Sequence, residues 1–117
     1  MNAAIPLNVF DPGCPSRRAF DAIFSRWGLL TLASLTDRPV RFGALKRAVG
    51  GISERMLAQT LKVLEEEGLV ERREYDVKPP RVEYWLSESG VRMAHSVGGL
   101  IGDLYQEVDR RLQNSAS

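Results

Sequence analysis

Apolar side chains recur at steps of three and four residues in five stretches of the chain, which is the spacing of one face of an α-helix. The predicted helices cover Pro15–Phe24, Arg26–Leu35, Phe42–Val49, Ser53–Glu67 and Glu88–Leu112. Ser53 and Ser87 are natural N-caps, because a serine hydroxyl accepts hydrogen bonds from the unpaired amides of a first turn. The residues predicted to point inward are Trp27, Leu30, Leu32 and Leu35 in the second helix, and Met56, Leu57, Thr60, Leu61 and Leu64 in the fourth.

Between the fourth and fifth helices, apolar residues recur at every second position instead of every third or fourth. This alternation predicts strands over Leu69–Tyr75 and Val82–Leu86, with Val77–Arg81 as a loop whose prolines cannot pair. Val40–Phe42 is predicted to begin as a short strand, and Gly68 stands where a helix C-terminus favours a left-handed residue. The pattern therefore predicts a mainly α fold with a small β-hairpin.

Two helices joined by a glycine-containing turn and followed by a hairpin form a winged helix-turn-helix. The turn here is Gly50–Gly51, so the helix that starts at Ser53 is predicted to enter the major groove of double-stranded DNA. Arginine binds guanine with two hydrogen bonds and glutamine binds adenine in the same way. The residues predicted for this recognition helix are Ser53, Glu54, Arg55, Gln59 and Lys62. The alternative is that they form an ordinary solvated helix face.

Basic residues outside the recognition helix gather in the middle of the chain. The segment from Arg38 to Arg81 contains ten basic and seven acidic residues, although the whole chain has a net charge of only +1. Phosphate contacts by such residues supply affinity, whereas base contacts supply sequence choice. The predicted wing and backbone contacts are Arg41, Lys46, Arg47, Arg72, Lys78 and Arg81. As an alternative, Arg72, Arg73, Glu71 and Glu74 pair across the hairpin.

Length and composition narrow the class of protein. A chain of 117 residues suits one domain, predicted here as an irregular arm over 1–13, a domain over 14–112 and a flexible tail over 113–117. The apolar stretches are too short for a membrane span and the first residues lack a secretory pattern, so a cytoplasmic location is expected. One cysteine and one histidine suggest neither a metal site nor a cofactor, and no catalytic pair indicates an enzyme.

Several runs together resemble the HxlR-type family of bacterial winged helix-turn-helix regulators, which is related to the MarR type. The run Pro79–Gly90 is the most specific, and Cys14-Pro15 and Trp27 also fit. The other matching runs are Arg41–Leu45, Gly51–Ser53, Met56–Leu57, Leu61–Glu65 and Gly68–Arg72. The chain departs from the family at Gly28, and it lacks the tryptophan often found in the last helix. That helix instead contains Gly98, Gly99 and Gly102.

The resemblance implies a homodimer on a palindromic operator, in which the first and last helices form the interface and binding represses or activates nearby genes. The implied interface residues are Phe20, Val97, Ile101, Leu104 and Val108, with room for a small-molecule effector between subunits. Some relatives sense oxidants or electrophiles with the cysteine that matches Cys14. Its place at a helix start near Arg17 and Arg18 favours the thiolate, although a free cysteine is commonly a small buried apolar residue. The alternative function is a winged helix that binds proteins without sequence-specific DNA binding.

Overall fold

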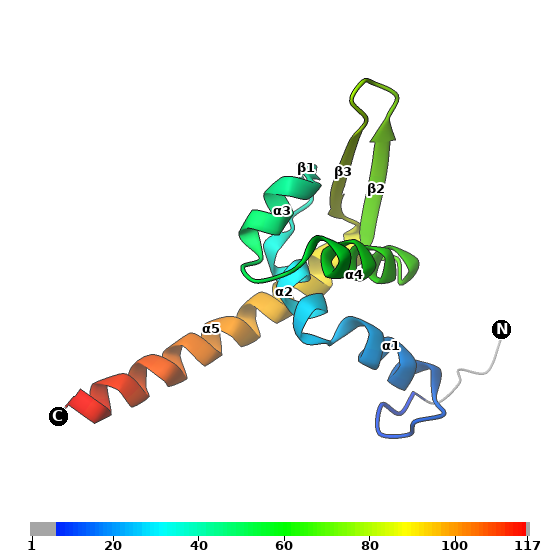
Figure 1. Ribbon diagram of the computed structural model, residues 1–117. Coiled ribbons are helices and arrows are strands. Elements are labelled where there is room, and N and C mark those ends of the chain that lie inside the picture. Colours follow the sequence, from blue (N-terminus) through cyan, green and yellow to red (C-terminus); the bar gives the residue numbers. More distant parts are fainter. Residues whose placement is uncertain (1–6, 117) are drawn as a thin grey trace.

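A computed structural model describes residues 7–116, and its elements follow the predicted order (Figure 1). The elements are α1 (Pro15–Ile23), α2 (Arg26–Ser34), β1 (Val40–Arg41), α3 (Phe42–Ala48), α4 (Glu54–Glu66), β2 (Val70–Tyr75), β3 (Arg81–Leu86) and α5 (Glu88–Ala116). Helices α2, α3 and α4 gather at the centre, the β2–β3 hairpin projects from them as the wing, and α5 extends away from the opposite side (Figure 1). This is the predicted mainly helical winged helix-turn-helix.

Local chemistry sets most of the helix boundaries. The hydroxyls of Ser25, Ser53 and Ser87 each accept a hydrogen bond at 3.0 Å from the amide three residues later, which caps the N-terminus of α2, α4 and α5. Gly51 and Gly68 have φ of +85° and +77°, in the left-handed region that glycine adopts without a Cβ clash. The turn before α4 and the exit from α4 therefore depend on these two glycines.

The sheet contains three antiparallel strands in the order β1-β3-β2. Cross-strand partners share a face, and successive residues alternate between faces. Val70, Leu86 and Tyr84 are buried, and we call their side of the sheet the inner face. The opposite side is the outer face. The residues on the outer face are Arg41, Glu71, Arg73, Tyr75, Arg81, Glu83 and Trp85.

One core connects the helices to the inner face of the sheet. Leu32 of α2, Leu45 of α3 and Leu57, Leu61 and Leu64 of α4 are almost fully buried, and Val70 and Leu86 close the cluster from the wing. This packing holds α4 at a set position relative to the wing, so that the two elements can act as one surface.

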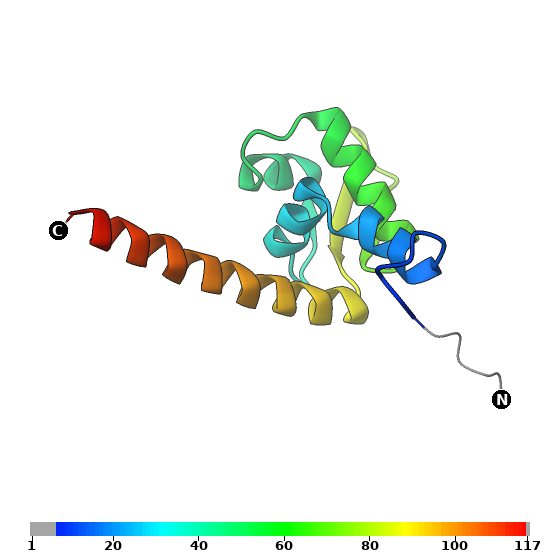
Figure 2. The ribbon, with the colours of Figure 1, turned by 90° about the horizontal axis from the view of Figure 1, so that it is seen from below.

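Helix α5 runs beyond the packed body of the domain (Figures 1 and 2). The radius of gyration is 17.1 Å, whereas a compact domain of this size has about 13 Å. Leu104, Val108 and Leu112 stay exposed along this extension. The fold thus leaves an apolar helix without cover from its own chain.

Several boundaries and inward positions differ from the sequence predictions. Helix α5 continues to Ala116 rather than Leu112, so residues 113–116 of the predicted tail are helical, and Gln113 bonds Asp109 across one turn. Arg81 pairs with Tyr75 in the sheet rather than lying in the loop, because the prolines end at residue 80. Leu30 and Met56 are exposed, at 41% and 36%, since both lie at the edge of their helix's apolar stripe. Residues 1–6 of the predicted arm and Ser117 lie outside the described residues.

Candidate nucleic-acid interface

Helix α4 exposes every residue that the sequence predicts for recognition. Leu57, Leu61 and Leu64 occupy the buried face, which turns Arg55, Gln59 and Lys62 to solvent on the opposite face. Ser53 is also exposed, but its hydroxyl accepts from the amide of Met56 and so serves the helix cap. The first two turns of α4 therefore present one guanidinium and one amide that no core contact restrains.

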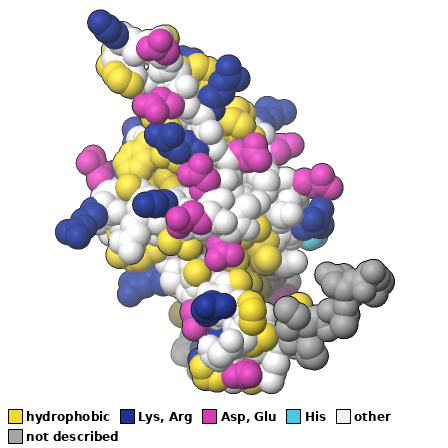
Figure 3. All heavy atoms as spheres, turned by 90° about the vertical axis from the view of Figure 1, so that its right-hand side faces the viewer, with side chains coloured by type: hydrophobic (Ala, Val, Ile, Leu, Met, Phe, Trp, Pro, Cys, Tyr) yellow, Lys and Arg dark blue, Asp and Glu magenta, His cyan; other side chains and the backbone are white. Residues whose placement is uncertain are grey.

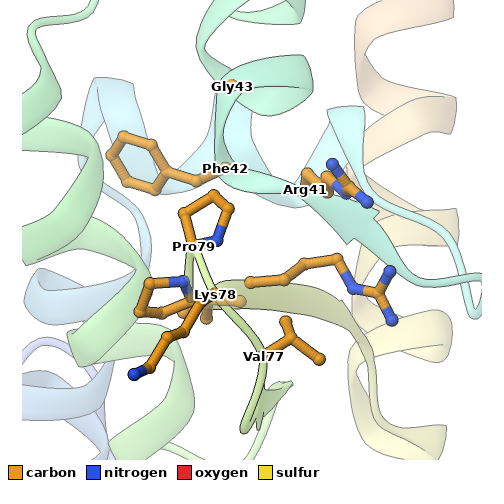
Figure 4. A pocket seen from close by; sticks show the side chains of 9 residues that line it. Arg41, Phe42, Gly43, Val77, Lys78 and Pro79 are labelled. Carbon is orange, nitrogen blue, oxygen red and sulfur yellow. The ribbon is translucent and has the colours of Figure 1, made fainter.

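A groove separates the start of α3 from the tip of the wing. Its volume is about 480 Å³, and Arg41, Lys78 and Arg81 bring three cations to its wall. Figure 4 shows Arg41 and Phe42 on one side of this groove and Val77, Lys78 and Pro79 on the other. Arg41, which is distant in sequence, thus comes together with Lys78 and Arg81, and we call this site the wing groove.

The two arginines in the middle of β2 lie on opposite faces of the wing. Arg72 belongs to the inner face, opposite Tyr84, and its guanidinium also lies 3.6 Å from Glu74. A hydrogen bond with Tyr84 raises the pKa of Arg72 above its usual value. Arg73 belongs to the outer face, and both arginines are exposed. Arg72 and Glu74 belong to the same strand, so their ion pair favours a role for Arg72 within the wing itself.

The two cations predicted on α3 differ in exposure. Arg47 is exposed, whereas Lys46 is half-buried. Both lie in the last turn of α3, close to the glycine turn that leads into α4. The guanidinium of Arg47 reaches back to Gly43, which lines the wing groove. Figure 3 shows basic side chains, in dark blue, both at the wing tip and on the body below it, with acidic side chains between them.

Cys14 lies at the N-cap of α1, where residues of the preceding arm cover it. Its side chain is 8% exposed, its Sγ lies 3.2 Å from the Ser16 hydroxyl, and the Asn8 amide donates to it at 3.4 Å. These hydrogen bonds, the one with Ser16 first, lower the pKa of the Cys14 thiol. Arg17, which was expected to favour the thiolate, instead binds Asp21 and the carbonyl of Val9.

A second, apolar groove follows the junction of α2 and α5, with α1 beside it. Its volume is about 630 Å³, and Leu30, Leu100 and Leu104 contribute most of its exposed apolar side chains. Phe20 is 43% exposed and lines an adjoining hollow with Phe24 and Leu29. Of the predicted interface residues, Val97 is buried within its own chain and Ile101 is half-buried. Phe20, Leu104 and Val108 remain exposed. We call this surface the α2–α5 groove.

Other kinds of site find no support in the part of the chain that the structure describes. Among residues 7–116, no group of three metal-binding side chains comes together. Within the same range, no helix is long and apolar enough to cross a membrane.

An exposed helix that follows a tight turn and lies beside a cationic wing defines the winged helix-turn-helix class of DNA-binding proteins. Residues 22–112 match the family described as HxlR-like helix-turn-helix. The chain therefore belongs to the HxlR-like helix-turn-helix family of transcriptional regulators, which are not enzymes. It is 44% identical over 93 residues to YtfH of Escherichia coli (strain K12), described as an uncharacterized HTH-type transcriptional regulator. That match covers 80% of this chain and 74% of YtfH.

Solved structures agree with this assignment. The ytfH protein of Salmonella typhimurium, described as a transcriptional regulator, superimposes with a TM-score of 0.84 at 38% identity, covering 96% of this chain and 100% of that one. The redox regulator HypR in its reduced form gives a TM-score of 0.67 at 32% identity, covering 86% and 98%. The fold and family that the sequence predicts are therefore confirmed.

Proposed function

We propose that this protein is a homodimeric regulator that binds a two-fold symmetric site in double-stranded DNA, with α4 in the major groove. The observation that carries the proposal is the joint placement of the exposed face of α4 and the wing groove on one rigid body. We assign Arg55 and Gln59, both exposed in the first two turns of α4, to base edges, and Lys62, which lies farther along the helix, to the DNA backbone. Arg41, Lys78 and Arg81 line the wing groove as a site for phosphates.

The proposed dimer follows from the apolar surface of α5. Leu100, Leu104 and Val108 are exposed, and two of them line the α2–α5 groove. The occupant that fits is a second copy of this chain, because two α5 helices would cover each other's exposed residues from Leu100 to Leu112. A two-fold dimer also places two copies of α4 in successive major grooves, about one helical turn apart.

The first experiment is a selection of bound duplexes from a random pool at low and high salt. The proposal predicts enrichment of a two-fold symmetric site with half-sites about one helical turn apart. The same selection with Arg55→Ala serves as the sequence-reading control. If only weak, sequence-independent binding remains at low salt, the DNA-regulator proposal fails and the protein-binding alternative takes its place.

Arg55→Ala is expected to weaken binding to the selected site by about 1–3 kcal/mol and to relax the sequence preference. The reason is that a bidentate contact to guanine is lost while the buried face of α4 is untouched. Fluorescence anisotropy with the selected duplex and with a random duplex measures both affinities. Equal losses on the two duplexes would show that Arg55 contacts only the backbone.

Lys78→Ala is the comparison variant for Arg55→Ala, because it removes one charge from the wing rather than from α4. It is expected to weaken binding to selected and random duplexes alike and to flatten the dependence on salt, by a slope of about 1. A loss confined to the selected duplex would instead place Lys78 at a base.

We further propose that oxidants or electrophiles regulate DNA binding through Cys14. Its support is the lowered thiol pKa together with the likeness to HypR, which is named a redox regulator. A thiolate is the reactive form of cysteine, so a lowered pKa raises its reactivity at neutral pH. The arm bonded to Cys14 through Asn8 lies next to α1 and would move when Sγ is modified.

Diamide takes the hydrogens of two thiols and joins the sulfurs as a disulfide, so the single Cys14 thiol is treated with diamide and glutathione, which gives a mixed disulfide. Cys14→Ser is expected to keep the selected duplex bound after this treatment, which releases the wild-type protein. Anisotropy after this treatment, followed by a thiol reductant, tests release and recovery. A second measurement is the pH profile of thiol alkylation, whose midpoint should lie below that of an unperturbed thiol, because the folded protein stabilises the thiolate. Release of the serine variant by the same treatment would exclude Cys14 as the sensor.

A further inference from the structure

The outer face of the wing carries an aromatic ring contacted by two guanidinium groups. The guanidinium carbon of Arg81 lies 4.2 Å from the centre of the Tyr75 ring, and that of Arg73 lies 4.9 Å from it. The register explains this arrangement, since Tyr75 pairs directly with Arg81 across the hairpin and Arg73 is two residues earlier on the same face. Three residues from two strands therefore form one cluster.

Glu83 supports the same cluster from the middle strand. It pairs with Arg73 on one side and with Arg41 on the other, and its carboxylate lies 3.8 Å from Nε of Arg81. This Nε is buried without a hydrogen-bond partner among the described residues, while the Arg81 side chain keeps 36% exposure. With Arg41, Arg73 and Arg81 against Glu71 and Glu83, the outer face keeps a net positive charge.

We infer that Arg73 and Arg81 form a single DNA-phosphate site on the outer face of the wing, with Tyr75 as its positioning residue. The inference rests on the proposed DNA-binding function and adds to it a cation that sequence analysis did not select. Stacking on an aromatic ring restricts a guanidinium before binding, so less conformational entropy is lost when it contacts a phosphate. Phosphate contacts of this kind act on every DNA sequence alike.

The test compares Arg73→Ala with Arg72→Ala, which remove the same charge from adjacent residues on opposite faces of β2. Affinity for a random duplex is measured by anisotropy over a series of salt concentrations. Arg73→Ala should bind more weakly and show a salt slope smaller by about 1, whereas Arg72→Ala should keep the wild-type slope. Equal slopes for the two variants, or a reduced slope for Arg72→Ala alone, would overturn the inference.

Tyr75 is tested by its conservative variant. Tyr75→Phe keeps the ring and should bind random DNA as the wild type does, while Tyr75→Leu should bind about three- to ten-fold more weakly. Thermal melts of both variants separate this effect from unfolding. Similar binding by folded Leu and Phe variants would remove Tyr75 from the site. If the wild-type protein binds no duplex, the proposed function itself fails. If the wild-type protein binds and Arg73→Ala binds equally well, only the inference about the wing fails.

Discussion

Gly90→Ala is expected to lower the free energy of unfolding by about 3 kcal/mol, the upper range for an added methyl group in a filled site. A Cβ at this position would lie 1.9 Å from the carbonyl oxygen of Leu69 and 3.2 Å from Cβ of Leu86. The Leu69 carbonyl cannot retreat without cost, because it accepts a hydrogen bond from the amide of Ser87. The start of α5 and the base of the wing are therefore in backbone contact at Gly90. Thermal or urea unfolding followed by circular dichroism measures the loss.

Gly99→Ala is the matched control on the same helix. A Cβ there would meet nothing within 4 Å, and the position is exposed. Alanine has the higher helix propensity by about 1 kcal/mol, so this variant should be slightly more stable than the wild type. If Gly90→Ala proved as stable as Gly99→Ala, the close approach at the base of the wing would be disproved.

Leu104→Glu is expected to dissociate the proposed dimer and, with it, to abolish binding to the two-fold symmetric site. A charge at this exposed position of the α2–α5 groove would be buried in both subunits of the dimer. Its desolvation should cost at least about 3 kcal/mol, which corresponds to a more than 100-fold weaker dimer. Analytical ultracentrifugation over a range of concentrations, together with anisotropy on the selected site, measures both effects.

Gln106→Glu controls for the added negative charge, because it lies on the same helix, is exposed and does not line the α2–α5 groove. It should remain dimeric and bind DNA nearly as the wild type does. A monomeric wild-type protein, or a Leu104→Glu variant with unchanged mass, would contradict the proposed interface. Circular dichroism on both variants establishes that each is folded.

Local sequence chemistry was sufficient to predict the order of elements and most of their boundaries. Ser53 and Ser87 cap helices as expected, and Gly68 adopts the left-handed conformation expected at the end of α4. These features depend on residues close together in the chain, so they can be recognised without a tertiary structure. The exposed residues of α4 were predicted for the same reason, since Leu57, Leu61 and Leu64 define its buried side.

Choices between two faces were harder to predict. Arg72 lies on the inner face with the buried Val70 and is hydrogen-bonded to Tyr84, while its predicted contact with DNA stays a prediction. The alternating pattern of β2 puts Arg72 and Arg73 on opposite faces. Deciding which of them shares the inner face requires knowing that Val70 is buried. The contacts of Tyr75 and Glu83 with Arg81 were not predicted, because they depend on the pairing and conformation of the hairpin strands.

The sequence by itself determined the helices, the hairpin and the class of protein, because periodicity, caps and turn residues act over a few positions. The tertiary structure decided which cations meet. It brought Arg41 to the wing groove, separated Arg72 from Arg73, and placed Gly90 against the Leu69 carbonyl. It also showed that α5 extends past the domain with Leu104 and Val108 uncovered. These outcomes depend on the packing of segments distant in the chain, which local spacing does not encode.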